Sequence, residues 1–153
     1  MFTLTVFVFI ACGGSASADS GKMRYLQLVK QPEGTVLLES SIMSGESFYI
    51  DYIHSSDLTP VHDIFQVDEK GNIVLIEEDY CWYGAGLEFH PRANAIISLE
   101  GEKTKVQLYR VFPHFLLRVG RVANHVFTYK NKQTPLKDLV PGGSLVWIRV
   151  ISR

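Results

Sequence analysis

Apolar and polar residues alternate in short runs along the chain from Met23 onward, and turn residues separate the runs. Within residues 105–110, Val106 and Leu108 share one face, and residues 145–151 alternate in the same way. A period of two residues is that of a β-strand, whose successive side chains point to opposite faces. No segment keeps the 3.6-residue period of a helix over several turns. The pattern therefore predicts an all-β fold.

Turn residues set the ends of the predicted strands. Proline fixes φ and glycine accepts a positive φ, so Gln31-Pro32-Glu33-Gly34 predicts a turn, and residues 68–72 predict a hairpin loop. Strands are predicted at residues 24–30, 35–42, 47–54, 61–67, 73–78, 95–99, 105–110, 115–119, 125–129 and 145–151, with a helical or 3-10 turn at 136–139. Turn signals at this spacing are typical of sandwiches and small barrels. We predict an antiparallel β-sandwich or partly closed β-barrel of short strands.

Length and composition narrow the class of protein. The chain has 153 residues, of which 46% are hydrophobic and 20% charged, and this suits one packed domain. The formal net charge of -1 gives no indication of a polyanion-binding surface, so we predict no nucleic-acid partner. Cys12 and Cys81 are the two cysteines, so packing rather than a disulfide framework must hold the fold.

The N-terminal residues 1–11 are apolar and uncharged. As a helix, residues 2–11 would be about 15 Å long, which is too short for a bilayer core of about 30 Å. The run has the size of the hydrophobic region of a signal peptide, although the usual positive residues before it are missing. We therefore predict an exported protein in the periplasm or at the extracytoplasmic face of a membrane. Residues 1–18 would be the signal peptide and residues 19–153 a single β domain.

Two cleavage sites are consistent with this segment. Ala16-Ser17-Ala18 has the small-x-small form of an ordinary signal-peptidase site, which would release a chain that begins at Asp19. Phe9-Ile10-Ala11-Cys12-Gly13 resembles a bacterial lipoprotein signal, in which cleavage precedes a lipidated Cys12. We predict contact with a membrane only through such a lipid anchor.

The end of the predicted strand 47–54 carries the first candidate site. His54 is followed there by Ser55 and Ser56, and strand ends are where polar side chains can leave the core and face a ligand. His54 and Ser55 are therefore predicted to bind a ligand, with His54 as a base or a donor. The alternative is structural, with a half-buried histidine that bonds a turn carbonyl and with Ser55 and Asp57 in an Asx or ST turn.

Asp63 is the second candidate. It is in phase with Val61, Phe65 and Val67 of its predicted strand, so its carboxylate is predicted to point into the core with them. An unpaired buried carboxylate is costly, so it needs donors or a cavity. The possible donors are backbone amides and the side chains of His54, Ser55, Ser56 and Arg118. Asp63 is predicted either to form an ion pair or turn cap, or to meet His54 across neighbouring strands and orient it.

Residues 80–87 join aromatic side chains to the run Gly84-Ala85-Gly86. These glycines predict a wide turn or bulge, or main-chain amides that approach an anion, and Gly84 and Gly86 are predicted in the ligand site. A dinucleotide fingerprint would need a third glycine and a helix, and neither follows. Cys81 is a candidate nucleophile with His54 or His62, but a lone cysteine is more often simply buried, and no nucleophile elbow surrounds it.

The five histidines are scattered along the chain. None of them shows the His-x-His or helical His-x-x-x-His spacing that zinc sites often use. We therefore predict no metal and no cofactor.

Three groups of residues carry a resemblance to a known family: Tyr52-Ile53-His54-Ser55, then Pro60-Val61 with Asp63 and Phe65, then Tyr80 with Tyr83-Gly84-Ala85-Gly86-Leu87. Val119-Gly120-Arg121, His125, Pro135-Leu136 and Gly142 add to it. The pattern resembles an uncharacterised family of small exported bacterial proteins with a domain of unknown function, commonly encoded beside TAXI-type TRAP transporters. That family more often has Glu at position 63 and Ser-Phe before Gly84, so Cys81 is a feature of this chain. The resemblance implies no catalytic residues, and it counts against a cysteine nucleophile.

Two functions follow from these observations. The resemblance implies a non-enzymatic accessory protein of a TRAP-type uptake system. It would bind a membrane or solute-binding subunit of the transporter, or a small organic anion such as a carboxylate, through His54, Ser55, Asp63, Gly84 and Gly86. The alternative is a small envelope hydrolase that uses Cys81 or Ser55 with His54 and Asp63.

Overall fold

The computed structural model describes residues 22–56, 58–81, 95–101 and 103–153. Its elements are the strands β1 (Arg24–Gln31), β2 (Thr35–Ser41), β3 (Ser47–Ile53), β4 (Pro60–Val67), β5 (Ile73–Tyr80), β6 (Ile96–Glu100), β7 (Lys103–Phe112), β8 (His114–Arg118), β9 (Val126–Tyr129), β10 (Lys132–Pro135) and β11 (Leu145–Ser152), and the 3-10 helix η1 (Leu136–Asp138). Within this part of the chain, no helix has the length and apolar character needed to cross a bilayer.

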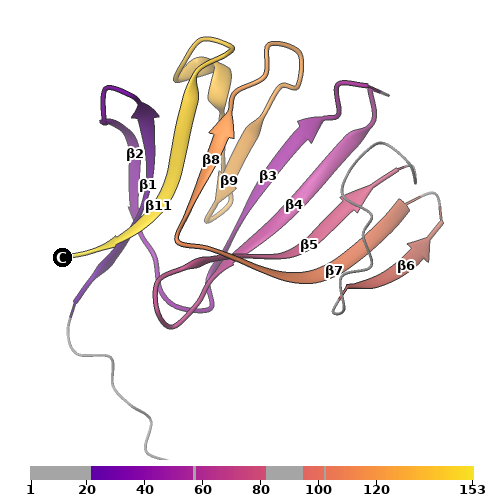
Figure 1. Ribbon diagram of the computed structural model, residues 1–153, viewed down its shortest axis with the longest axis horizontal. Helices are drawn as coiled ribbons and strands as arrows, with labels where there is room; N and C mark the ends of the chain where they lie inside the picture. Colours follow the sequence, from indigo (N-terminus) through magenta and orange to yellow (C-terminus); the bar gives the residue numbers. More distant parts are fainter. Residues whose placement is uncertain (1–21, 57, 82–94, 102) are drawn as a thin grey trace, which may run out of the picture.

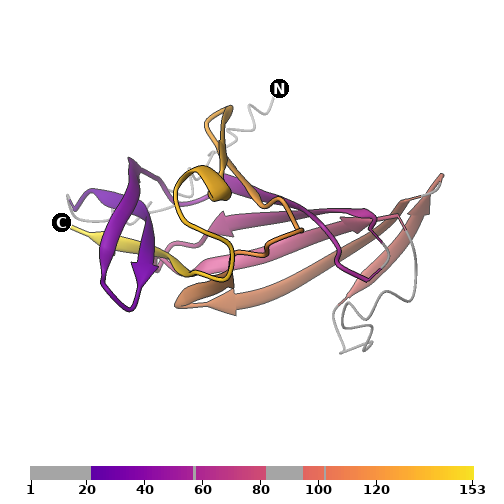
Figure 2. The ribbon, with the colours of Figure 1, turned by 90° about the horizontal axis from the view of Figure 1, so that it is seen from above.

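The strands form two antiparallel sheets that pack as a sandwich (Figure 1). The smaller sheet has the order β2-β1-β11-β8, and the larger has the order β10-β9-β3-β4-β5-β7-β6. Figure 2 shows the indigo and yellow strands of the smaller sheet at one end of the molecule, and β6 with the neighbouring part of β7 at the other. The predicted sandwich is confirmed. The barrel alternative is wrong, because the described strands form two separate sheets, each with its own pair of edge strands.

The core lies where the two sheets face each other. Phe48 and Phe65 stack there with ring centroids 5.1 Å apart, and Phe127 packs 5.5 Å from Phe48. All three phenylalanines come from the larger sheet and are fully buried. Leu26 from β1 and Ile148 from β11 belong to the same cluster and close it from the smaller sheet. In these strands, alternate side chains share one face of the sheet, and that face is the one buried in the core.

Each predicted strand corresponds to an observed one, with ends that differ by at most two residues. The predicted turn at 136–139 is η1. The alternation in 105–110 is also confirmed, since Val106 is buried and the flanking Gln107 is exposed. The strand β10 was missed, because Lys132-Gln133-Thr134-Pro135 contains no valine, isoleucine, leucine or aromatic residue to mark a strand. Its pairing with β9 across a tight turn defines it instead.

The register of three central strands decides which side chains can meet. Ile50 of β3 lies opposite Asp63 of β4, and Asp63 lies opposite Glu78 of β5, so these three point to the core side of the larger sheet. One residue further along β3, Asp51 lies opposite His62, so this pair points to the other side. A single sheet thus separates two groups of polar residues by the alternation of its side chains.

Candidate functional site

Two hollows meet at the end of the larger sheet where β3 ends and β4 begins. We call one the basic hollow, which is lined by His54, Ser55, Arg121 and His125 among others and has a volume of about 330 Å³. We call the other the acidic cavity, which is lined by Asp51, His62, Asp79, Cys81 and Lys103 among others and has a volume of about 560 Å³. Tyr52 and Ile53 line both, so the hollows share a wall.

The basic hollow takes one side from the turn after β3. The His54 N–H donates to the Thr59 carbonyl at 2.8 Å, and the Leu58 N–H donates to the His54 carbonyl at 3.0 Å, which closes the turn. The His54 Nδ1 lies 3.0 Å from the Ser56 hydroxyl. His54 is half-buried and Ser55 is exposed. The strand end therefore presents the half-buried His54 and the exposed Ser55 to the basic hollow, and their predicted role in binding a ligand stays a prediction.

The segment between β8 and β9 forms the other side of the basic hollow. The Ile53 N–H donates to the Ala123 carbonyl at 2.7 Å, which fixes this segment to the end of β3. The Gly120 N–H donates to the His125 Nδ1 at 3.2 Å, and the His125 ring lies against Tyr52 with centroids 5.3 Å apart. Burial lowers the pKa of His125, which keeps its imidazole neutral and able to accept this bond. A Cβ at Gly120 would lie 2.8 Å from the Ala123 Cβ, so only glycine fits this close approach.

Arg121 supplies the basic hollow with a permanent cation. Its side chain packs on Gly142, where an added Cβ would lie 2.7 Å from the Arg121 Cγ. Arg121 was not among the predicted site residues. Arg118, which was predicted as a possible donor to Asp63, instead donates from its guanidinium to the Gly143 carbonyl at 3.3 Å. The run Val119-Gly120-Arg121 did belong to the family pattern, and that was the signal that could have identified Arg121.

The acidic cavity is organised around a cross-strand pair. The His62 Nδ1 lies 2.6 Å from the Asp51 Oδ1, and the His62 ring stacks on Tyr49 with centroids 5.3 Å apart. The ring is therefore fixed in orientation by a carboxylate on one side and an aromatic face on the other. Asp79 lies opposite His62 on β5. Its Oδ1 is buried and has no hydrogen-bond partner in the described part of the chain. The free thiol of Cys81 is half-buried in the same cavity.

Asp63 lies on the other side of the sheet and lines neither hollow. It is only 8% exposed, and its Oδ1 has no hydrogen-bond partner among the described residues. Burial, followed by the charges of Glu78 and Asp51, raises the pKa of Asp63 to about 8. Burial also raises the pKa of Tyr52, with a further contribution from Asp63. The predicted ion pair or turn cap at Asp63 is wrong. Glu78 and Asp51, the charged groups of the described chain that shift its pKa, are both acids, and Asp63 lies inside β4 rather than at a turn.

The predicted meeting of His54 and Asp63 is also wrong. Asp63 lies opposite Ile50, and His54 is four residues beyond Ile50. At about 3.3 Å per residue, the two positions are about 13 Å apart along the sheet. Of the predicted ligand-binding residues, the structure thus brings His54 and Ser55 together and separates Asp63 from them. Gly84, Gly86 and Cys12 lie outside the described residues, so their predicted roles remain predictions.

Within the described residues, no group of three or more histidines, cysteines or acidic side chains is arranged to hold a metal ion. Fold and site together define an antiparallel β-sandwich with polar hollows at one end. Residues 48–136 match the family described as Domain of unknown function (DUF1850), and the match covers more than half of the chain. The chain therefore belongs to that family, which agrees with the expected uncharacterised family. No curated protein and no solved structure matches the chain.

Proposed function

We propose that this protein is an exported, non-enzymatic accessory of a TRAP-type solute uptake system, and that it binds a small organic anion in the basic hollow. The observation that carries the proposal is the composition of that hollow. Among its described lining residues are one permanent cation, Arg121, two imidazoles and the hydroxyl of Ser55, and none is a carboxylate. A guanidinium beside hydroxyl and imidazole donors is the donor set that recognises a carboxylate.

The acidic cavity supports the same assignment by contrast. Two carboxylates line it, those of Asp51 and Asp79, and Lys103 is the one lysine among its described lining residues. Such a lining repels an anion, so a carboxylate ligand is directed to the other side of the shared wall. The export and the link to a transporter rest on the apolar residues 1–11 and on the family resemblance. A transporter subunit could reach the basic hollow because it lies at one end of the sandwich.

We expect succinate or glutarate to raise the melting temperature of the protein and to give a measurable heat in calorimetric titration. The Arg121→Gln variant should lose about 10-fold to 100-fold in affinity, because a hydrogen bond to a charged group is worth roughly 1.5–3 kcal/mol. The matched control is Arg118→Gln, which removes the same charge from β8, outside the hollow. It should bind as the wild type does.

The same variants serve in a pull-down against the cognate transporter subunits. A transporter subunit that recognises the basic hollow should be retained by wild type and by Arg118→Gln and lost with Arg121→Gln. If all three proteins bound the dicarboxylates with equal affinity, Arg121 would not contribute to the binding site. A well-folded protein that binds neither a dicarboxylate nor a transporter subunit would contradict the proposed function.

A second candidate function, an envelope hydrolase, has one observation in its favour. Cys81 lines the acidic cavity together with the hydrogen-bonded pair Asp51 and His62. A thiol, an imidazole and a carboxylate that orients the imidazole are the parts of a cysteine nucleophile site. The sequence version of this hypothesis used His54 and Asp63, which the structure does not bring together. Of the two histidines that the sequence offered as partners, His54 and His62, it is His62 that lines the cavity of Cys81, and Asp51 supports it as the carboxylate.

If Cys81 acts as a nucleophile, an electrophilic acyl-transfer probe should form a covalent adduct on it. His62→Gln should slow that labelling about 100-fold, the usual size of a general-base contribution. His114→Gln, on β8 and outside both hollows, should leave the rate unchanged. Peptide mass spectrometry would locate the adduct. Wild-type protein that shows no adduct at Cys81, Ser55 or Ser56 would exclude common acyl-transfer chemistry.

A further inference from the structure

A third hollow, of about 620 Å³, lies at the other end of β3, beside the start of β1. We call it the methionine hollow, and its lining includes Lys22, Met23, Arg24, Met43 and Lys130. The segment that leads from β2 into β3 crosses this end, and β3 runs from here toward the basic hollow. The methionine hollow and the basic hollow are therefore at opposite ends of the same strand.

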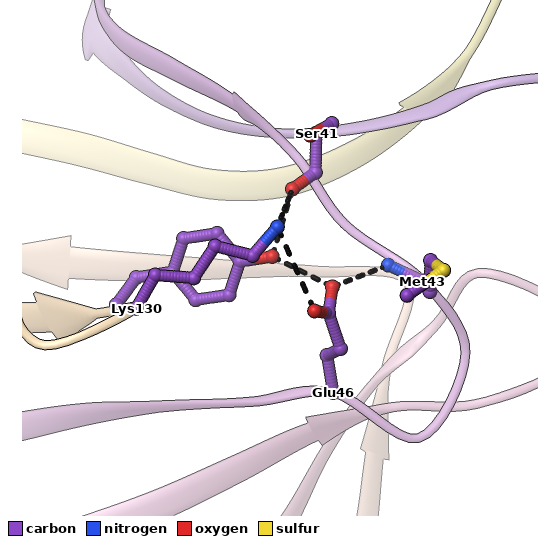
Figure 3. Close-up of polar contacts among 5 residues, drawn as sticks. Ser41, Met43, Glu46 and Lys130 are labelled. Carbon is purple, nitrogen blue, oxygen red and sulfur yellow. Dashed lines mark hydrogen bonds and ion pairs between the residues drawn. The ribbon is translucent and has the colours of Figure 1, made fainter.

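Polar contacts fix the rim of the methionine hollow. Figure 3 shows Glu46 at the centre of these contacts, where it accepts the Met43 N–H at 2.7 Å and lies 3.6 Å from the Lys130 ammonium. The Lys130 ammonium also donates to the Ser41 carbonyl at 3.1 Å. Across the hollow, the Arg24 guanidinium donates to the Ser44 hydroxyl at 2.5 Å. These hydrogen bonds and the ion pair therefore fix the backbone from which the side chains of the rim project.

The methionine hollow is both cationic and apolar. Three of its lining residues, Lys22, Arg24 and Lys130, are cations. The carboxylate of Glu46 lies 3.6 Å from the Lys130 ammonium at the rim, so these four side chains together carry a net charge of +2. Met23 is 62% exposed and Met43 is 69% exposed. Long apolar side chains among lysines and arginines are the composition of surfaces that lie in the headgroup region of a bilayer.

The start of the described chain adds a positional argument. Lys22 is three residues after Asp19 and ten residues after Cys12. If Cys12 carries a lipid, ten extended residues span at most about 35 Å, so this end of the sandwich stays close to the membrane. If cleavage follows Ala18 instead, the chain begins three residues before Lys22, beside the cations.

We propose that the methionine hollow docks on the surface of an anionic lipid bilayer, with phosphate headgroups at the three cations and the two methionines at the acyl boundary. The inference rests on the proposed export but not on ligand binding at the basic hollow. Each net positive charge near an anionic surface raises partitioning about fivefold, so the net charge of +2 gives roughly 25-fold. An attraction of this size is enough to orient the protein on a membrane. In that orientation the basic hollow faces away from the lipid.

The test uses the mature chain with Cys81→Ser and an environment-sensitive dye on Met43→Cys. The chain used begins at Asp19 and so contains no Cys12, which leaves position 43 as its one cysteine and no lipid anchor. Vesicles of phosphatidylcholine and phosphatidylglycerol (3:1) should shift the dye emission to the blue. Pure phosphatidylcholine, or the anionic vesicles in 0.5 M salt, should give little shift. A dye on Val122→Cys, which lines the basic hollow, should not respond.

Charge variants complete the experiment. Lys22→Gln with Lys130→Gln should remove most of the blue shift at position 43. Lys103→Gln with Lys137→Gln removes the same charge from other exposed sites and should leave the shift intact. Equal responses at positions 43 and 122, no response to anionic vesicles, or an unchanged shift in the first double variant would each overturn the proposal. None of these outcomes bears on anion binding at the basic hollow, so the two proposals fail separately.

Discussion

At pH 8, the Asp63→Asn variant is expected to be more stable than the wild type by about 3 kcal/mol, and this advantage should shrink steadily toward pH 4. The folded protein holds the Asp63 proton up to about pH 8, whereas the ordinary pKa is 3.8. Between these values the unfolded chain binds fewer protons than the folded one, so the free energy of unfolding falls as pH rises. The contribution of Asp63 is fully present below pH 3.8 and is lost as pH rises through 8.

The size of this effect follows from the interval between the two pKa values. One group changes stability by at most about 1.4 kcal/mol per pH unit, which sets a ceiling near 6 kcal/mol over this interval. We expect about half of it, because water and neighbouring groups relax around a buried charge. An asparagine keeps the shape of Asp63 but cannot ionise. The unfolding free energy of the Asp63→Asn variant should therefore not decline in this way as pH rises. An ion pair at Asp63 would give the opposite result, a variant that is less stable at pH 8.

Urea unfolding at several pH values between 4 and 8 measures the difference. Asp68→Asn is the matched control for Asp63→Asn. Burial by itself would raise the pKa of Asp68, but hydrogen bonds from Asn72 and Lys70 outweigh burial and lower it. The stabilisation from Asp68 is therefore present above its unfolded pKa and is lost as pH falls, which is the reverse of Asp63. Parallel stability curves for wild type and Asp63→Asn would contradict the buried-acid assignment.

The Phe48→Ala variant is expected to lose about 3–5 kcal/mol of unfolding free energy, the usual cost of removing a buried phenylalanine. Phe48 is fully buried and touches both Phe65 and Phe127, so its removal leaves a cavity between β4 and β9. A domain of this size is stable by roughly 5–15 kcal/mol, so the loss is a large fraction of the total. Urea unfolding followed by circular dichroism would measure it.

The next residue along β3 is the control for Phe48→Ala. Tyr49 points to the opposite side of the sheet, where its ring stacks on His62. Tyr49→Ala should cost only about 1 kcal/mol, the value of an exposed aromatic pair. The contrast between two aromatic neighbours measures how strongly one face of β3 is buried. Similar losses for both variants would mean that the sandwich core does not lie on the Phe48 side.

The orientation of the molecule links the two ends of β3. The basic hollow, which we propose as the anion site, lies where β3 ends, and the methionine hollow lies where it begins. A protein docked by its methionine hollow would present the basic hollow to the solvent or to a transporter partner. Binding of a dicarboxylate and binding to vesicles should therefore be compatible, and neither should compete with the other.

The hydrophobic alternation and the turn residues were enough to predict every described strand except β10, because both are local properties of the chain. The alternation also predicted correctly that Asp63 points inward with Val61 and Phe65, which are buried. The residues around positions 54 and 120 that carry the family resemblance line the two sides of the basic hollow. Sequence spacing could not show that these segments, far apart in the chain, are joined by the hydrogen bond from Ile53 to Ala123.

The sequence by itself determined the all-β antiparallel class, every strand except β10 and the inward direction of Asp63, since a period of two residues needs no knowledge of the neighbouring strands. The choice between sandwich and barrel came from the tertiary structure. Only the tertiary structure decided which residues lie opposite one another. The register of β3 and β4 separates His54 from Asp63 and joins Asp51 to His62 instead. Pairing register is set by the packing of whole strands against each other, and a shift of a few residues changes every partner without changing the pattern along either strand.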